Sequence, residues 1–517
     1  MIRKIQQHFS AFLAGILLVF LVVTALITEG YYGGADNISH FLISHYAFRH
    51  PALFLDSWGR PLYTLLSAPF AQFGLAGARM LNVLLAWGTG WLAFRAARKL
   101  GIRNAPAAMV FILFTPLFFV MIPTALTEIL FGFLLLLGAF LSLEKRYIPA
   151  AVAWSLLPFA RTEGYVLLPF LLPVFLFRRQ YRAIPFLAAG TILLSLAGGL
   201  YYRDLFWLIN RFPYPVNYTH PIYHQTGSLW HFAVYAPAML GYPLLVLFVA
   251  GIAGMVAGLF SHHPENRSNA RMILHLALLP FLAYFALHSV LFWKAMGGSM
   301  GLERVMAAVL PLAALVALKG MDDLFRLFRI PDKLTTAAAV VVSGLVVAMP
   351  FVIFTFPTLL TPEEETVRRA AAWLKESPWK DRPVYYTDQN VPYYLGADPW
   401  VKNPATCVLF GDSKYLDTIP AGSVLVWDAH FGANESKIPL DSLLQYPGQK
   451  MLACFRPLKP WLTFGGGWYE GCLITSILPR GQTADNYAIY DSLSESIDLD
   501  GSDTLLYLNT FENSGDA

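Results

Sequence analysis

Charged residues are scarce in this 517-residue chain. Only 14% of the residues are charged and 56% are hydrophobic, whereas soluble proteins carry about 25% charged residues. A soluble protein of this length would need enough polar residues to cover several domains, so the composition excludes one. Aromatic residues make up 15% of the chain, which excludes a disordered protein. The sequence therefore predicts an α-helical polytopic membrane protein.

Cysteine is also scarce, and its distribution is uneven. The chain has three cysteines, Cys407, Cys454 and Cys472, and all lie in its last third. This distribution fits a C-terminal domain in an oxidising compartment, with Cys454 and Cys472 as a candidate disulfide. The alternative, three unpaired cysteines, stays open.

The charges that are present divide the chain into two parts. Residues 1–356 hold 25 Lys and Arg against 12 Asp and Glu, whereas residues 357–517 hold 12 against 21. We predict a transmembrane domain over 1–356 and a soluble α/β domain over 357–517. The cations of the first part lie in short loops between apolar segments, where membrane topology explains them, so we expect no binding to nucleic acid.

The acidic part has an α/β pattern. It predicts a helix over Glu363–Lys375 and short buried strands over Pro383–Tyr386, Thr406–Phe410 and Ser423–Trp427. The stretch Trp427–His430 is interpreted as a turn at the end of a strand. No metal-binding or triad motif is recognised here, and no metal ligand is assigned.

The first part contains eleven apolar segments near the roughly 20 residues that a bilayer requires. With the N-terminus in the cytoplasm, 17 of the 25 cations fall on the cytoplasmic side, as the positive-inside rule requires. An odd number of spans then places the C-terminal domain outside the cytoplasm. The predicted spans are about 10–28, 77–95, 105–122, 124–143, 147–160, 163–177, 183–202, 233–258, 272–293, 303–318 and 335–356.

In this topology the charged residues that are not cytoplasmic anchors gather at the outer face. Charge at membrane depth is costly and indicates a functional site. The first outer loop, residues 29–77, adds a helix-like stretch from Asn37 to Phe48 that contains His40, and an apolar stretch from Leu62 to Phe73. The loop 203–232 is rich in aromatic residues and includes His220. The charged residues of this face that we single out as candidates for a site are Asp36, Glu128, Arg161, Glu163, Lys294, Glu303 and Arg304.

These features resemble the C-type glycosyltransferase (GT-C) superfamily. The resemblance rests on Asp36 just after the first span, on the Arg-x-Glu-Gly hairpin at Arg161–Gly164 and on Gly-Leu-Glu-Arg at Gly301–Arg304. It extends to the two helical stretches of the first loop and to an outward soluble domain after the last span. Members of this group take a sugar from a polyprenyl-phosphate carrier and pass it to an acceptor outside the cytoplasm.

The resemblance implies an enzyme of the bacterial inner membrane with a periplasmic C-terminal domain. Its partners would be membrane lipids, a polyprenyl-phosphate sugar donor, and a lipid, glycan or protein acceptor, as in mannosyl- and aminoarabinose-transferring members. Many members carry two adjacent acids in the first loop, whereas here Asp36 is followed by Asn37. A divalent cation as cofactor is therefore left open.

Residue roles follow from the resemblance. Asp36 would be the general base that takes the proton of the acceptor hydroxyl. The leaving lipid phosphate would be bound by three cations, Arg161, Lys294 and Arg304. Five further residues would bind or orient the substrate: Glu128, Glu163, Glu303, His40 and His220.

Each assignment has a structural alternative. Asp36 could cap a helix, Arg161 and Glu163 could form an ion pair that closes the hairpin, and Lys294 could be an interface anchor. Glu303 could be ordinary interface charge, and Glu128 a packing residue. At the level of function the alternatives are a lipid or glycan transporter and a non-catalytic glycan-assembly protein. The span centres carry few polar residues, mainly His275 and His288, which argues against a transport path.

Overall fold

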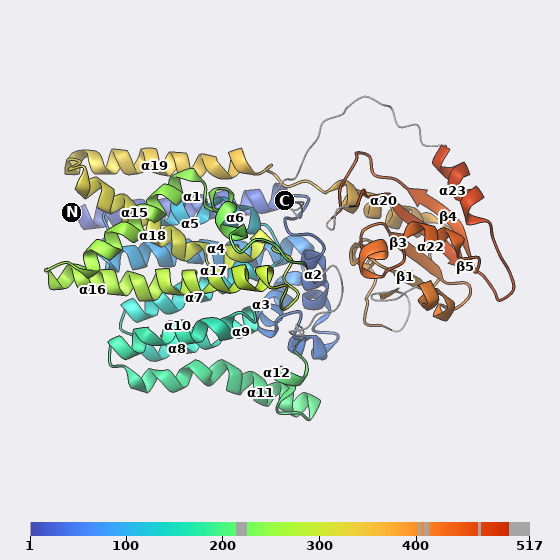
Figure 1. Cartoon of the computed structure of the whole chain (residues 1–517), viewed down its shortest axis with the longest axis horizontal. Helices are drawn as coiled ribbons and strands as arrows, with labels where there is room; N and C mark the ends of the chain where they lie inside the picture. Colours follow the sequence, from blue (N-terminus) through green and yellow to red (C-terminus); the bar gives the residue numbers. More distant parts are fainter. Residues whose placement is uncertain (1, 213–224, 402–404, 408–412, 464–466, 496–517) are drawn as a thin grey trace. The chain divides into compact units, whose positions relative to one another are not determined.

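The computed structural model describes residues 2–212, 225–401, 405–407, 413–463 and 467–495. The chain divides into two compact units, Met1–Leu359 and Leu360–Ala517 (Figure 1). His220, which the sequence analysis places at the substrate, lies outside the described residues. Unit 1 is helical, and unit 2 contains the sheet.

Unit 1 is a bundle of apolar helices joined by short segments. Its first outer loop folds into α2 (Asp36–Tyr46), the 3₁₀ turn η1 (Pro51–Leu55) and α3 (Pro61–Ala71), so the two predicted helical stretches are confirmed. The longer helices of the bundle are α1 (Ile2–Ile27), α4 (Gly74–Lys99), α7 (Glu128–Leu143), α10 (Gly164–Phe177), α11 (Ala189–Tyr202), α15 (Tyr242–Leu259), α17 (Leu279–Trp293), α18 (Leu310–Leu327) and α19 (Asp332–Ile353). Shorter helices are α5 (Ala107–Leu113), α6 (Pro116–Met121), α8 (Tyr147–Ser155), α9 (Leu157–Ala160), α12 (Trp207–Asn210), α13 (His231–Val234), α14 (Ala236–Leu240) and α16 (Pro264–Ile273).

Five helical segments in the described part of unit 1 are long and apolar enough to cross a membrane. The other predicted spans are shorter, more charged or interrupted. Span 105–122, for example, breaks between α5 and α6, where Thr115 is extended and Pro116 starts a new helix. The five segments are His8–Ile27, Tyr181–Tyr202, Tyr242–Leu259, Pro264–Trp293 and Asp332–Ile353.

Burial separates an inner layer of unit 1 from a lipid-facing layer. All residues of α5 and α6 are buried, whereas α11 and α19, at opposite edges of the bundle in Figure 1, are mostly exposed and apolar. An apolar exposed face is stable when lipid, rather than water, covers it. The structure therefore describes an integral membrane protein.

Buried polar side chains fix the segments that carry the outer face. Arg79 of α4 donates hydrogen bonds to the carbonyl groups of Thr28 and Gly30, which follow the end of α1. The amide of Asn82 donates to the carbonyl groups of Thr124 (2.8 Å) and Leu126 (2.9 Å). Both side chains are buried, so they satisfy carbonyl groups that water cannot reach. These contacts set where the first outer loop begins and where α7 begins.

Unit 2 is a five-stranded mixed sheet with helices on both faces. The strand order is β2-β1-β3-β5-β4, and β1 is parallel to both of its neighbours, whereas β5 is antiparallel to β3 and β4. The strands are β1 (Val384–Tyr386), β2 (Ala405–Cys407), β3 (Val424–Asp428), β4 (Gln449–Phe455) and β5 (Cys472–Ile477). The first three match predicted strands; β4 and β5 were not predicted.

The helices of unit 2 divide between the two faces of the sheet. The helices α20 (Pro362–Glu376) and α21 (Asn390–Leu395) share one core with Val384 and Ile474. On the other face, α22 (Leu440–Gln445) and α23 (Asn486–Glu495) pack around Trp427 and Leu473. The predicted helix over Glu363–Lys375 is confirmed as α20, and a capping box between Thr361 and Glu364 fixes its start.

The candidate disulfide was wrong, because Cys454 and Cys472 are both free. Cys454 lies opposite Leu473 in the β4–β5 ladder, so Cys472 is one residue out of register with it. Successive side chains of a strand point to opposite faces. Accordingly, Cys454 packs with the core around Trp427 and Cys472 with the core around Val384.

Candidate active site

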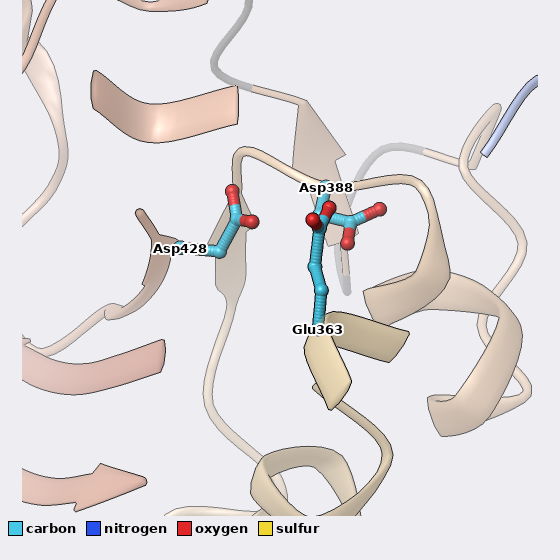
Figure 2. A group of neighbouring side chains, drawn as sticks. All are labelled: Glu363, Asp388 and Asp428. Atoms are coloured by element: carbon cyan, nitrogen blue, oxygen red, sulfur yellow. The ribbon is translucent and has the colours of Figure 1, made fainter. Parts of the chain in front are cut away.

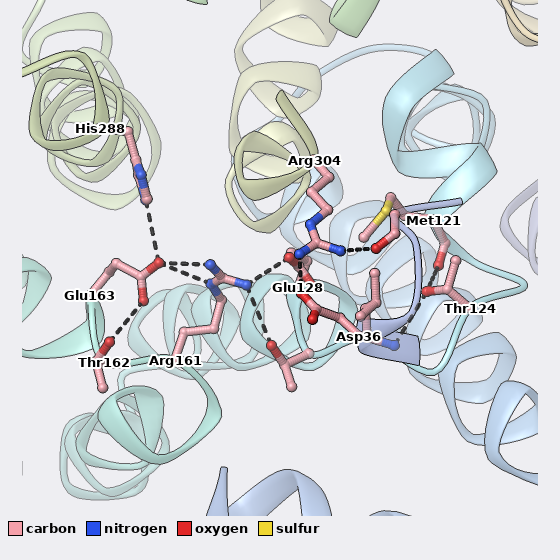
Figure 3. A network of polar contacts seen from close by, with 12 residues as sticks. Asp36, Met121, Thr124, Glu128, Arg161, Thr162, Glu163, His288 and Arg304 are labelled. Atoms are coloured by element: carbon pink, nitrogen blue, oxygen red, sulfur yellow. Dashed lines mark hydrogen bonds and ion pairs between the residues drawn. The ribbon is translucent and has the colours of Figure 1, made fainter. Parts of the chain in front are cut away.

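Arg161 is the centre of a buried ion network in unit 1 (Figure 3). It follows α9 in extended backbone, and its Nη1 atom lies 2.6 Å from Oε1 of Glu128, the first residue of α7. Its Nη2 atom lies 2.7 Å from Oε1 of Glu163, which precedes α10. The three side chains are 11%, 3% and 13% exposed. The structure therefore joins three residues that the sequence analysis singled out.

The network extends to α17 through two residues that the sequence analysis did not assign to it. His288 Nε2 lies 3.4 Å from Oε1 of Glu163, and the Tyr284 hydroxyl lies 3.5 Å from the same oxygen. Both belong to one face of α17, one helical turn apart. Their spacing was the only sequence signal, and the sequence analysis named His288 only as one of the few polar residues at the span centres.

Asp36 and Arg304 form a second ion pair at this face. Arg304 lies in the 3₁₀ turn η5 (Glu303–Ala308). Its Nη2 atom donates a hydrogen bond to Asp36 Oδ2, and its Nη1 atom donates one to the carbonyl group of Gly33. Gly33 has φ +90°, and a Cβ atom there would lie 2.8 Å from Arg304 Nη1. The glycine thus permits the close approach of the guanidinium group. In Figure 3, Glu128 lies between the guanidinium groups of Arg161 and Arg304.

Asp36 is the first residue of α2 and does not act as a side-chain cap. The N-cap residue is Ala35, which makes no side-chain hydrogen bond. The Asp36 side chain is 42% exposed, compared with 13% for Arg304. The carboxylate is therefore reachable, while the guanidinium group that contacts it is largely desolvated.

Asn37 has a structural role. Its Nδ2 atom donates to the carbonyl groups of Tyr32 (3.0 Å) and Gly34 (2.9 Å), and its Oδ1 atom accepts the Ala125 amide at 2.9 Å. An aspartate could not donate those two hydrogen bonds. Since these backbone groups use both donors and the acceptor, Asn37 holds the loop in place, and of these two adjacent residues only Asp36 supplies a carboxylate.

Three predicted site residues lie outside the Arg161 network and the Asp36–Arg304 pair. Lys294 is exposed, with Nζ 3.6 Å from the centre of the Trp293 ring, and Glu303 pairs with His231 at 3.4 Å. His40 is buried and stacks on Trp58 at 4.7 Å. Burial lowers the pKa of His40 to about 3, against the smaller opposing effect of Asp36. Its imidazole is therefore neutral and belongs to the interior of the first outer loop.

Comparison with solved structures supports the predicted fold, whereas comparison of sequences finds no relative. No family model and no curated protein matches the sequence. Among solved structures, ArnT from Cupriavidus metallidurans in the apo state has a TM-score of 0.62 at 14% identity, covering 90% of this chain and 97% of that one. The same protein bound to undecaprenyl phosphate has a TM-score of 0.63 at 13% identity, with the same coverage.

A second similar structure comes from an archaeal protein. The oligosaccharyltransferase AglB from Archaeoglobus fulgidus, in complex with an inhibitory peptide and a dolichol-phosphate, has a TM-score of 0.51 at 11% identity. The match covers 90% of this chain and 74% of that one. Both similar proteins are GT-C enzymes, as the sequence motifs predict. This chain therefore has the fold of the GT-C glycosyltransferases.

Proposed function

We propose that this protein is a glycosyltransferase that uses a polyprenyl-phosphate-linked sugar as donor. The observation that carries the proposal is the pair of desolvated arginines, Arg161 and Arg304, gathered with the reachable carboxylate of Asp36. The GT-C fold supports it, because similar structures hold undecaprenyl phosphate and dolichol-phosphate. The acceptor is a lipid, a glycan or a protein at the outer membrane face.

Asp36 takes the proton of the acceptor hydroxyl as that oxygen attacks the anomeric carbon. The bond between this carbon and the phosphate oxygen breaks, and the leaving polyprenyl phosphate carries the negative charge. Arginine suits this phosphate because its planar fork binds two oxygens at once. When the phosphate binds Arg304, the guanidinium group leaves Asp36, so donor binding frees the carboxylate to act as base.

The other residues support these two groups. Glu128 and Glu163 hold Arg161 in place, and His288 and Tyr284 in turn contact Glu163. Lys294 is a further candidate for the phosphate, at the exposed rim of the membrane unit. Glu303, His40 and His220 are candidates for orienting or binding the substrate. Glu303 would act together with His231, and His40 would act by supporting the fold of the first outer loop.

The proposal includes an orientation in the membrane. The N-terminus lies in the cytoplasm, residues 1–356 carry the catalytic machinery, and residues 357–517 form a domain outside the cytoplasm, in a bacterial inner membrane. The cationic loops between the helices support this orientation through the positive-inside rule.

The test is sugar transfer from a polyprenyl-phosphate donor by the purified full chain in proteoliposomes. Release of free polyprenyl phosphate is the readout. We expect Arg304→Ala to reduce the rate about 10²- to 10³-fold, as loss of a group that stabilises developing charge does. Arg304→Lys should retain part of the activity, because the charge remains but the fork is lost. The control is Arg178→Ala, an exposed cation at the end of α10; if it lowers the rate equally, the phosphate role of Arg304 is wrong.

A further inference from the structure

Three buried carboxylates meet in unit 2, remote in sequence from one another (Figure 2). Glu363 lies in the first turn of α20, Asp388 follows β1, and Asp428 is the last residue of β3. One oxygen atom from each lies within 4.8 Å of the other two. Their exposed fractions are 9%, 0% and 0%. The sequence analysis interpreted the end of β3 as a turn and assigned no ligand here.

The cluster lies where the strand order of the sheet reverses, between β1 and β3. Strand β1 has β2 on one side and β3 on the other, and both pairs are parallel. In open α/β sheets, ligands bind outside the carboxyl ends of parallel strands, at the point where the strand order reverses. Asp388 and Asp428 both lie at these carboxyl ends. The cluster therefore lies at the position of the sheet that favours a bound group.

Each carboxylate is held mainly through one of its oxygens. Oε1 of Glu363 lies 2.7 Å from Nδ1 of His430. Asp388 Oδ1 accepts from the Asn390 backbone N–H at 2.8 Å, and its Oδ2 atom accepts from the Asn390 side chain at 3.2 Å. Asp428 Oδ1 accepts from three groups, Thr387 Oγ1 (3.2 Å), Phe431 N (2.9 Å) and Gly432 N (3.2 Å), and its Oδ2 atom accepts from the His430 backbone N–H at 3.4 Å. The second oxygens are thus weakly satisfied.

Tyr469 is a second, independent sign of a bound group. Its hydroxyl is buried, the residue being 3% exposed, and it has no hydrogen-bond partner among the described residues. The backbone brings the segment that carries Tyr469 to the same end of β3 as the cluster, because Asp428 pairs with Cys472 and the Ala429 N–H donates to the Gly471 carbonyl group. A buried hydroxyl without a partner is costly, and a water bound to an ion in the cluster would supply one.

The composition of the cluster also favours a bound cation. Three buried carboxylates lie together and, among the described residues, the basic side chain in contact with them is His430, whose Nδ1 atom lies 2.7 Å from Oε1 of Glu363. Carboxylates buried together are costly unless they are paired or bind a metal ion. A divalent ion would supply that compensation.

We propose that Glu363, Asp388 and Asp428 bind one hard divalent cation, with the Tyr469 hydroxyl on a water of that ion. Carboxylate oxygens are the ligands that such ions prefer, and we choose Ca²⁺ as the probe because its coordination geometry is flexible. The His430 contact to one oxygen of Glu363 orients the other oxygen, as partners of metal-binding side chains do. The site is independent of the proposed glycosyl transfer.

The test is Ca²⁺ binding by the purified full chain in detergent after removal of metals with a chelator. We expect Ca²⁺ at about 1 mM, an affinity typical of extracellular sites, to raise the Tm of unit 2, because a ligand bound only by the folded state stabilises it. Luminescence of Tb³⁺ excited through nearby Trp and Tyr residues, such as Trp427 and Tyr469, should appear and be displaced by Ca²⁺. A wild-type chain with neither response overturns the proposal.

Two variants locate the site. Asp388→Asn should abolish the Ca²⁺ response while the chelated variant remains at least as stable as the chelated wild type, because one buried negative charge is removed. Tyr469→Phe should lower the affinity several-fold without abolishing binding. Glu376→Gln, an exposed residue at the end of α20, is the matched control and should keep the full response. An unchanged Ca²⁺ response in Asp388→Asn would overturn the assignment, and if this variant fails to fold, Tyr469→Phe and the wild-type titration decide.

Discussion

At the residue scale, the sequence indicated which charged residues of the outer face lie together, but it did not indicate which other side chains contact them. Asp36, Glu128, Arg161, Glu163 and Arg304 were singled out because charge is rare in an apolar chain. The structure gathers all five into the Arg161 network and the neighbouring Asp36–Arg304 pair. Their partners could not be predicted. His288 contacts Glu163, whereas His275 contacts the Phe177 ring. The sequence does not distinguish the two histidines, because their contacts depend on how the helices pack.

Asn37 supplies a test of the first outer loop. We expect Asn37→Asp to lower the stability of the protein by about 1–3 kcal/mol, because the carbonyl groups of Tyr32 and Gly34 lose buried donors. The measurement is thermal unfolding in detergent, with the exposed Asn266→Asp as control. If both variants unfold at the wild-type temperature, the amide does not hold this loop.

His40 makes the stability depend on pH. Its folded-state pKa is about 3, below the ordinary value of 6.5, so the unfolded chain binds this proton first as the pH falls. The contribution of His40 is therefore complete above pH 6.5 and is lost as the pH falls from there towards 3. We expect His40→Phe, which keeps a ring against Trp58, to lose less stability than the wild type between about pH 7 and about pH 5. Parallel pH profiles of unfolding would contradict the assignment.

At the scale of elements, composition predicted the helices and the first three strands but not their interruptions or partners. The apolar segment 105–122 gave no sign that Pro116 would divide it into two buried helices. Strand β4 mixes buried and exposed residues, and β5 contains Thr475 and Ser476, so neither was recognised as a short apolar strand. Their antiparallel register, which separates Cys454 from Cys472, depends on a β-bulge between Met451 and Ala453 that the sequence does not mark.

Close packing of α7 on α8 supplies a test at this scale. A Cβ atom at Gly138 would lie 2.1 Å from Nε1 of Trp154, which is fully buried and donates to Leu135. We expect Gly138→Ala to destabilise the protein by about 1–3 kcal/mol, as overpacking does. A Cβ atom at Gly15 of α1 would meet no other atom within 4 Å, so Gly15→Ala should leave the Tm unchanged or raise it. Equal unfolding temperatures for the two variants would contradict this packing.

At the scale of the whole molecule, two units carry separate sites of different chemistry. Unit 1 places arginines and carboxylates at one face of an apolar bundle, and unit 2 places three carboxylates at the ends of parallel strands. The GT-C fold was predicted from short motifs together with the order of spans and soluble domain. The carboxylate cluster was not predicted, since each of its residues is unremarkable alone and only the strand order joins them.

The most direct test of the central claim is sugar transfer by Asp36→Asn. The amide keeps the shape of the side chain but cannot take a proton, so we predict a rate about 10²- to 10⁴-fold below that of the wild type, with donor binding retained. Glu29→Gln, an exposed carboxylate of the same loop, should transfer sugar at the wild-type rate. Transfer by Asp36→Asn at the wild-type rate would contradict the assignment of Asp36 as the base.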